Sequence, residues 1–336
     1  MAKVKYSIIL PVKNGGDYIK ECVNSILSQT FDDFELIVLI HDTTDDTVNW
    51  LKSLNKKKIT IHYEDGVNGI IGNWQRALSV PKGEFMTIIG YDDLLDKDYL
   101  QTIDSFVKAY PDASLYQTHF NYINSTGGHI KKCKPMPLKE NAVDFLKSFL
   151  ANSVDIMATG FMMRSKDYDA LGGIPAYPNL LFADMELWLR LTQIGYKVTA
   201  PNTTFSFRIH QSVTTTSSDE KLQQAFERVI LFLELLKIED EQMAKVIEDN
   251  AIPFIHYYCK SLSHRLIRTN KKSRPGVSVA TVIKKCKQYA DILVPGNNYN
   301  PVTDYKVKLA KYIDSNLLLS KMFLMLRKIY KKPIYK

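Results

Sequence analysis

A regular alternation of apolar runs and helical patterns over residues 1–125 constrains the fold more than any other feature of this chain. The apolar runs are short and nearly continuous, which predicts strands buried on both faces of a sheet. Between them, apolar residues recur at helical spacing over 10 to 15 residues, as at residues 68–80 between the third and fourth predicted strands. The predicted strands cover residues 6–12, 34–40, 59–63 and 85–89. This order is typical of an α/β fold, with a mostly parallel sheet flanked by helices.

The pattern changes after residue 125 and again near residues 214–218. Short strands and helices are predicted first, at residues 114–122, 142–150, 156–163, 185–194, 197–200 and 205–209. Long helical patterns then follow at residues 220–236, 241–266, 279–292 and 305–330. We therefore predict two domains, an α/β domain over residues 1–216 and a helical domain over residues 217–336.

Composition sets limits on the class of protein. The chain has 336 residues, 45% of them hydrophobic and 24% charged, which excludes disordered and fibrous classes. No apolar run is long enough to span a bilayer, and the N-terminus enters a strand pattern directly, so neither a membrane helix nor a signal peptide is expected. The four cysteines lie far apart without metal-ligand spacing, as expected for reduced thiols in a cytoplasmic protein.

Positive charge is concentrated at the C-terminal end of the chain. Residues 256–336 contain 18 Lys and Arg against 3 Asp and Glu, a net charge of +15, whereas the rest carries −7. Such a surface attracts anionic lipid headgroups, nucleic acids or polyanionic glycans. The segment 315–336 is also amphipathic. It is consistent either with a helix lying in a membrane interface or with one packed on its own domain.

Two adjacent carboxylates, Asp92 and Asp93, follow the predicted strand 85–89. Ligands collect at the carboxyl ends of parallel strands, and Mg²⁺ or Mn²⁺ usually binds one or two carboxylates together with substrate phosphates. An Asp pair before a helix is also ordinary turn and cap chemistry. The pair alone therefore indicates either a metal–diphosphate site or a structural turn.

Four ordered segments resemble the family 2 glycosyltransferases, which have the GT-A fold. The resemblance covers roughly residues 4–216 and is specific because the segments occur in the right order at the right intervals. The segments are YSIILPVKNGGDYIKECVNSILSQTFDDFELIV, GEFMTIIGYDDLL, ALGGIPAYPNLLFADMELWLRLTQIGYKV and FRIHQSVTTT. The resemblance implies an inverting, metal-dependent transferase with a nucleotide-sugar donor.

Roles for individual residues follow from this resemblance. Asp184 falls where the family places its catalytic base, although as the cap of the helix 185–194 it also has a structural interpretation that is compatible with catalysis. The resemblance assigns Asp92 and Asp93 to Mn²⁺ or Mg²⁺. Arg208 and His210 belong to the loop that closes on the donor diphosphate, and His210 is a third expected metal ligand.

The resemblance also implies a nucleotide pocket with two departures from the family pattern. The implied pocket residues are Pro11, Val12, Asn14, His41, Asp42, Asn73, Arg76 and Asp92. Relatives usually end the second strand in Asp-Asp, where this chain has Ile40-His41, so Asp42 or neutral His41 is left to accept from the base. Relatives also carry an Asp at the position of Gly90, which leaves this chain fewer metal ligands.

We therefore predict transfer of a sugar, from a donor that is expected to be UDP-linked, to a glycan or lipid-linked saccharide acceptor in bacterial surface polysaccharide synthesis. The expected location is the cytoplasm, with peripheral contact to the inner face of the membrane as an open alternative. A nucleotidyltransferase is a rival, but residues 13–17 are sparse for a triphosphate loop. A second rival interpretation is a catalytically impaired sugar-binding relative. Nucleic-acid binding is not expected, because the basic tail lacks a recognisable module.

Overall fold

The computed structural model describes residues 4–67, 69–210 and 217–329, which divide into two units. The first unit comprises Met1–Phe145 and Val154–Ser212, and the second comprises Leu146–Ser153 and Val213–Lys336. The second unit thus includes a short segment that the sequence did not separate from its surroundings. The boundary expected near residues 214–218 lies partly outside the described residues, so the division at residue 216 stays a prediction.

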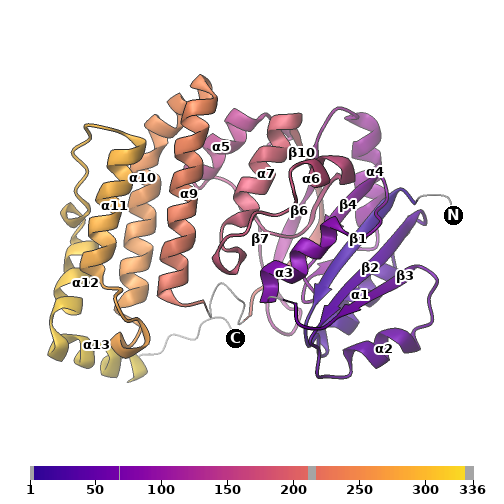
Figure 1. The fold of residues 1–336 in the computed structure, drawn as a ribbon, viewed down its shortest axis with the longest axis horizontal. Helices are drawn as coiled ribbons and strands as arrows, with labels where there is room; N and C mark the ends of the chain where they lie inside the picture. The colour runs from indigo at the N-terminus through magenta and orange to yellow at the C-terminus, as the bar shows by residue number, and fades with distance from the viewer. Residues whose placement is uncertain (1–3, 68, 211–216, 330–336) are drawn as a thin grey trace. The chain divides into compact units, whose positions relative to one another are not determined.

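Within the described part of the chain, the first unit is built on a ten-stranded sheet (Figure 1). Eight strands form its main path, and β7 (His129–Lys132) and β8 (Lys139–Glu140) pair with β6 and β10 respectively. The order along the path is β3 (Ile59–Glu64), β2 (Phe34–His41), β1 (Tyr6–Val12), β4 (Phe85–Ile88), β9 (Phe161–Arg164), β6 (Leu115–Ile123), β10 (Lys197–Arg208) and β5 (Leu94–Leu95).

Strand direction divides this sheet into two parts. β1 pairs in parallel with β2 and β4, and β2 pairs in parallel with β3, as the sequence predicted. From β9 onward the sheet is mixed, because β9 runs antiparallel to both β4 and β6, while β6 and β10 are parallel. Two antiparallel steps restore the original direction, so β4 and β10 point the same way. Their carboxyl ends therefore lie on one edge of the sheet.

Helices pack on the sheet through apolar positions that recur at helical spacing. Every residue of β1 is buried, and in α1 (Tyr18–Leu27) Ile19, Val23 and Ile26 are buried in the same core. A strand buried at every position has both faces covered, which explains the continuous apolar run at residues 6–12. The other α-helices that lie wholly within the described part of this unit are α2 (Thr47–Ser53), α3 (Gly69–Gln75), α4 (Tyr99–Ala109), α6 (Ser165–Ala170) and α7 (Ala183–Ile194).

Three elements of the first unit differ most from expectation. The helix predicted over residues 68–80 ends as a 3₁₀ turn at Arg76–Leu78. The strand predicted from residue 156 begins only at Phe161, because Gly160 adopts a φ of 79° and a Cβ there would meet the Phe205 ring at 2.8 Å. The two strands predicted at 197–200 and 205–209 are one strand, β10, whose register shifts on either side of Thr203.

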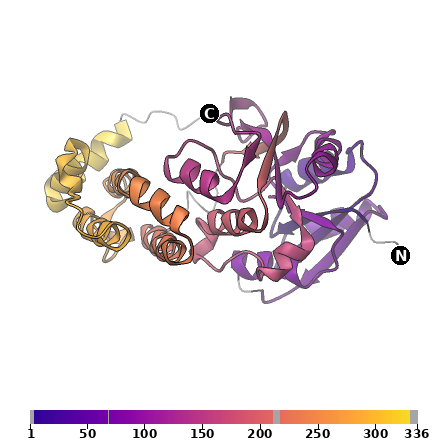
Figure 2. The same cartoon turned by 90° about the horizontal axis from the view of Figure 1, so that it is seen from above.

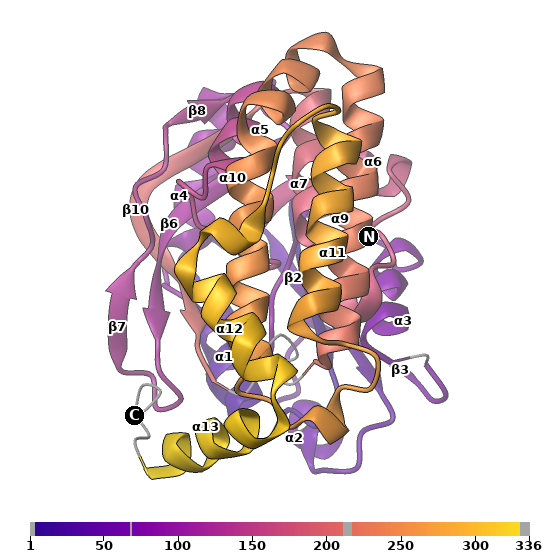
Figure 3. The same cartoon turned by 90° about the vertical axis from the view of Figure 1, so that its left-hand side faces the viewer.

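The second unit is helical, as predicted. In Figures 1 and 3, α9 (Asp219–Glu239), α10 (Glu241–Leu266) and α11 (Val279–Leu293) lie side by side and contact one another. The helix α12 (Tyr305–Ser315) packs on α10 and α11 and contacts α13 (Leu317–Ile329). Figure 2 shows α12 and α13 in yellow beside the other helices of this unit. The helix α5 (Ala142–Leu150) contributes residues to both units.

The single helix predicted over residues 305–330 is divided into α12 and α13. Asn316 lies between them in an extended conformation, and its side-chain oxygen accepts a hydrogen bond of 3.1 Å from the Leu319 amide. Asparagine favours this arrangement because its side chain competes with the helical backbone for hydrogen bonds. In residues 4–67, 69–210 and 217–329, no helix has both the length and the apolar character needed to cross a membrane.

Candidate active site

The loop after β4 carries Asp92 and Asp93 to the edge of the sheet where β1, β2 and β10 also end. The Asp93 amide donates to the Gly90 carbonyl at 3.1 Å, which closes a tight turn. Gly90 makes this turn possible, because a Cβ at that position would lie 2.6 Å from an Asp92 carboxylate oxygen. The departure from the family pattern at Gly90 therefore leaves room for Asp92 rather than only removing a ligand.

The two adjacent carboxylates have different environments. The Asp92 side chain is 22% exposed, and its carboxylate contacts the Nε2 atom of His210. Asp93 is buried, and its two oxygens accept from the Thr159 hydroxyl at 2.7 Å and from the Arg208 amide at 3.1 Å. Burial, reinforced by the charge of Asp92, raises the pKa of Asp93 well above its ordinary value. Asp93 therefore holds the loop in place, whereas Asp92 stays partly accessible to solvent beside His210.

Arg208, the last residue of β10, fixes the positions of three segments around Asp92. Its Nε atom donates to the Asp92 carbonyl at 2.7 Å, and Nη2 donates to the Glu21 carboxylate on α1 at 2.6 Å. Nη1 reaches the carbonyls of Asn124 and Ser125 after β6, at 3.3 and 3.2 Å. The side chain has no exposed surface, so Arg208 is a positioning residue in this structure. Its direct contact with a diphosphate stays a prediction.

His210 follows β10 and comes close to Asp92 because β4 and β10 end on the same edge. Its ring lies 5.3 Å from the Tyr18 ring, and the Arg208 guanidinium lies 4.6 Å from that same ring. The remaining residues of the closing loop, 211–216, lie outside the described residues. The structure thus brings together Asp92 and His210, which the sequence placed in one site.

These two side chains are suitable ligands for a divalent metal. Carboxylate and imidazole groups both bind Mn²⁺, and a donor diphosphate supplies further oxygen ligands. Among the residues that the structure describes, no group of three or more His, Cys, Asp or Glu side chains is placed to hold a metal ion. This differs from the expected set of three ligands, because Asp93 is directed toward Thr159 and the Arg208 amide.

The expected nucleotide pocket lies at the ends of β1 and β2. Pro11 and Val12 are buried in β1, and Asn14 follows with a φ of 51°. The Asn14 side-chain oxygen accepts from the Thr44 amide at 2.8 Å, which ties the loop after β1 to the loop after β2. Asn14 therefore shapes the pocket edge, and its contact with a nucleotide stays a prediction.

Ile40 and His41 end β2 where relatives usually carry an acidic pair, and Asp42 follows them. His41 is buried, and its Nδ1 atom lies 3.2 Å from the Asp42 carboxylate. Asp42 accepts from the Gly66 amide at 2.9 Å, and this bond, followed by the one to His41, lowers the pKa of Asp42. Asp42 therefore remains an ionised acceptor at this edge, which is the property that recognition of a base N–H requires.

Asn73 and Arg76 are engaged by backbone carbonyls at the ends of β2 and β3. The Asn73 amide donates to the Leu39 carbonyl at 3.1 Å, and Arg76 donates to the carbonyls of Ile40 and His62 at 2.9 and 3.0 Å. Arg76 also pairs with Glu64 and bonds the Asn73 oxygen. Both residues fix the helix α3 against the strand ends, and nucleotide contact by either one stays a prediction.

Asp184 lies in the first turn of α7, because this helix begins at Ala183, two residues earlier than a cap at Asp184 would require. The cap position is Phe182, and the half-buried Asp184 carboxylate is bonded by the amides of Asp184 and Met185. Burial raises the pKa of Asp184 to about 6 despite these two bonds. A carboxylate with a pKa close to neutral is suited to accept a proton from a hydroxyl group.

The neighbours of Asp184 on α7 have structural partners. Glu186 accepts a hydrogen bond of 2.7 Å from the Tyr177 hydroxyl. Trp188 stacks on Phe161 of β9 with ring centroids 4.5 Å apart and donates to the Met157 carbonyl at 2.9 Å. Glu186 is therefore engaged by Tyr177, and the assignment of Asp184 as the base stays a prediction.

Sequence reasoning missed three residues that organise the site, namely Glu21, Tyr18 and Thr159. Each acts through Arg208, His210 or Asp93 and comes from a segment distant in the chain. No motif marks them, because a buried hydrogen-bond partner can be supplied by many residue types from any adjacent element. The position of Thr159 next to the start of an antiparallel strand is a feature that only the sheet topology reveals.

Comparison with proteins of known structure supports this description of the fold. The chain is similar to S. aureus TarS 1–349 in complex with UDP-GlcNAc, with a TM-score of 0.56 and 14% identity, over 99% of this chain and 93% of that one. It is also similar to the mannosyltransferase PcManGT from Pyrobaculum calidifontis in complex with GDP-Man and Mn²⁺, with a TM-score of 0.52 and 15% identity, over 98% and 89% of the two chains. The fold is therefore that of the GT-A glycosyltransferases.

Sequence comparison then identifies the family. Residues 7–172 match the model of glycosyl transferase family 2. Similar relatives include glycosyltransferase GlyG of Streptococcus pneumoniae serotype 4, at 26% identity over 36% of this chain and 41% of that protein. Another is the poly(ribitol-phosphate) beta-glucosyltransferase of Bacillus spizizenii, at 31% identity over 31% and 17% of the two chains. The chain belongs to glycosyl transferase family 2, and these matches span less than half of either relative.

Proposed function

We propose that this glycosyltransferase transfers a sugar with inversion from a UDP-linked donor to a glycan or lipid-linked saccharide acceptor of a bacterial surface polysaccharide. One observation carries the proposal. Asp184 is a half-buried carboxylate with a pKa raised to about 6, on the element where the family places its base. A group of this kind takes the proton of an acceptor hydroxyl near neutral pH.

The proposed reaction is a single displacement. The acceptor oxygen forms a bond to the anomeric carbon while the bond from that carbon to the diphosphate oxygen breaks. The hydroxyl proton passes to Asp184, and the electron pair of the broken bond stays with the nucleoside diphosphate. A bound Mn²⁺ or Mg²⁺ supplies charge stabilisation to that leaving group. Asp92 and His210 are the residues proposed to hold the metal.

The remaining residues at the sheet edge are proposed to position the donor. Asn14 and Asp42 border the pocket for the nucleoside, and Asp42 keeps an ionised oxygen to accept from the base. Arg208 and Asp93 hold the Asp92 loop in a fixed conformation, which reduces the reorganisation needed when the diphosphate binds.

Named ligands of the similar structures favour a nucleotide-sugar donor but differ in the nucleotide. TarS is described with UDP-GlcNAc, whereas PcManGT is described with GDP-Man and Mn²⁺. The Bacillus relative acts on poly(ribitol-phosphate), which suggests a phosphate-containing surface polymer as one acceptor to test. We propose UDP because Asp42 lies one residue from the position where family members usually carry the carboxylate that accepts from uracil.

The backbone argues against a nucleotidyltransferase. A triphosphate loop needs free amide groups after the first strand. Here the Gly15 amide donates to the Thr47 hydroxyl at 3.1 Å, and the Gly16 amide donates to the Asp45 carboxylate at 3.0 Å. Both amides are already bonded within the protein, and Asp45 adds a negative charge where the triphosphate would lie.

A panel of nucleotide sugars in the presence of Mn²⁺ tests the proposal. The donor should raise the melting temperature by mass action, with UDP-sugars expected to exceed GDP-, ADP- and CMP-linked ones. Release of UDP on addition of acceptor should follow. Release of pyrophosphate from UTP and a sugar phosphate would instead support a nucleotidyltransferase. Stabilisation without turnover on any acceptor tested would support a catalytically impaired relative.

A further inference from the structure

The helix α13 presents an apolar stripe to the solvent. Leu318, Met322 and Met325 lie at positions i, i+4 and i+7, and their exposed fractions are 67%, 46% and 61%. Leu326 borders the stripe and is 49% exposed. In a helix that only packs on its own domain, the stripe with this spacing faces the core. An exposed stripe of large apolar side chains marks a surface that another apolar phase covers.

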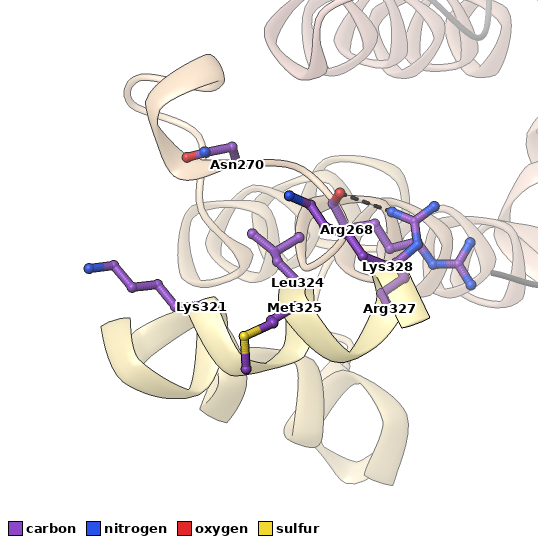
Figure 4. Close-up of a pocket in the computed structure, with 7 residues that line it drawn as sticks. All are labelled: Arg268, Asn270, Lys321, Leu324, Met325, Arg327 and Lys328. Atoms are coloured by element: carbon purple, nitrogen blue, oxygen red, sulfur yellow. Dashed lines mark hydrogen bonds between the residues drawn. The ribbon is translucent and has the colours of Figure 1, made fainter. Parts of the chain in front are cut away.

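Cations border this stripe on one side. A pocket of about 460 Å³ lies between α13 and the segment that follows α10 (Figure 4). It is lined by Arg268, Asn270, Lys321, Leu324, Met325, Arg327 and Lys328. Arg327 donates to the Arg268 carbonyl at 3.1 Å, which fixes one guanidinium at the pocket wall. The described lining thus contains four cationic side chains and no acidic one.

We propose that α13 docks this unit on an anionic lipid bilayer. The apolar stripe enters the interface, and the pocket formed by Arg268, Lys321, Arg327 and Lys328 binds headgroup phosphates. Only a bilayer accounts for both features at once. A polyanionic glycan pairs the cations but leaves Leu318 and Met322 in water.

A second copy of the chain covers the stripe but brings the same cations against one another. This surface shares no residue with the candidate active site, so the inference does not depend on the proposed function. The sequence left membrane contact as one of two alternatives for this segment. The proposal assigns that contact to named residues of α13.

Co-sedimentation with vesicles tests the charge component. The wild-type protein should bind phosphatidylglycerol-containing vesicles, bind pure phosphatidylcholine vesicles much more weakly, and lose binding as NaCl is increased. The double variant Lys321→Gln/Lys328→Gln should bind anionic vesicles roughly 30-fold more weakly, equivalent to about 1 kcal/mol for each cation. The control Lys284→Gln/Lys287→Gln removes two exposed cations from α11 and should keep wild-type binding.

A second pair of variants tests the apolar component. Leu318→Gln/Met325→Gln should lower the partition coefficient roughly tenfold, because the side chains no longer gain from leaving water. The control Leu231→Gln/Ile238→Gln changes two exposed apolar residues of α9 and should have no effect. Circular dichroism checks that each variant keeps its helical content.

Three outcomes would overturn the proposal. The first is absence of wild-type binding to anionic vesicles, or binding that both α13 variants leave unchanged. The second is binding to soluble dextran sulfate, sensitive to Lys321→Gln/Lys328→Gln, without vesicle binding, which would assign the pocket to a polyanionic glycan. The third is a dimer in sedimentation equilibrium that Leu318→Gln/Met325→Gln dissociates, which would assign the stripe to a second copy.

Discussion

Replacing Asp184 with Asn should abolish turnover and at the same time stabilise the protein above pH 6. The pKa of this carboxyl rises from its ordinary 3.8 to about 6 because burial disfavours the charged form. A rise of roughly two pH units corresponds to about 3 kcal/mol. This value is an upper limit, because Asp184 keeps some contact with water. The asparagine side chain has nearly the same shape and never carries the charge.

The sign of the effect follows from proton linkage. A carboxyl with a raised pKa in the folded state contributes its full stability below about pH 4, and this contribution is lost as the pH rises through about 6. The Asn variant should therefore match the wild type near pH 4 and exceed it by up to about 3 kcal/mol at pH 8. Thermal unfolding at the two pH values measures the difference. Asp32→Asn, at a 98% exposed side chain, is the control and should show no such change.

Turnover provides the second half of this test. If Asp184 is the base, the wild-type rate should fall about tenfold per pH unit below pH 6, because only the ionised form accepts a proton. Donor binding should survive in the Asn variant. Near-wild-type turnover in Asp184→Asn would show that another group is the base. An unchanged stability difference between pH 4 and pH 8 would show that burial does not perturb this carboxyl.

Three further substitutions test the framework around the site. Arg208→Lys should lower both kcat and the melting temperature, because an ammonium cannot reach the Asp92 carbonyl and Glu21 together, and kinetics with circular dichroism would measure the two losses. Gly90→Ala should weaken Mn²⁺-dependent donor binding roughly tenfold in calorimetry, since its Cβ displaces the Asp92 carboxylate. Arg76→Ala should lower the free energy of unfolding by about 1–3 kcal/mol, because it leaves the carbonyls of Ile40 and His62 unpaired, and thermal unfolding would measure this loss. Weaker nucleotide binding with unchanged stability would contradict its positioning role.

Much of the fold followed from the sequence because its strands are buried on both faces. The four N-terminal apolar runs became β1, β2, β3 and β4 with ends that shift by at most one residue. The long helical patterns of the second unit were equally regular, and α10 spans the predicted residues. Where prediction was incomplete, single residues decided the outcome, as with Gly160 before β9 and Asn316 between α12 and α13.

The candidate site was less accessible to sequence reasoning. The motifs pointed to Asp92, His210 and Asp184, whose roles stay predictions, and they did not distinguish Asp92 from Asp93. Their difference arises from the burial of Asp93 against Thr159, a residue 66 positions away in the chain. Direction within the sheet mattered in the same way, because two antiparallel steps bring β10, and with it His210, to the edge where β4 ends. Neither relation has a local signature.

Calorimetric titration of UDP in Mn²⁺ and in EDTA tests whether Asp92 and His210 bind the donor diphosphate through a metal. We predict that UDP binds in Mn²⁺ and that its affinity falls sharply in EDTA. Asp92→Asn and His210→Gln should each weaken the binding in Mn²⁺ about 10- to 100-fold. Asp17→Asn, at a 92% exposed side chain, should bind as the wild type does. Equal UDP affinity in Mn²⁺ and EDTA, unchanged by either site variant, would show that Asp92 and His210 hold no metal for the donor.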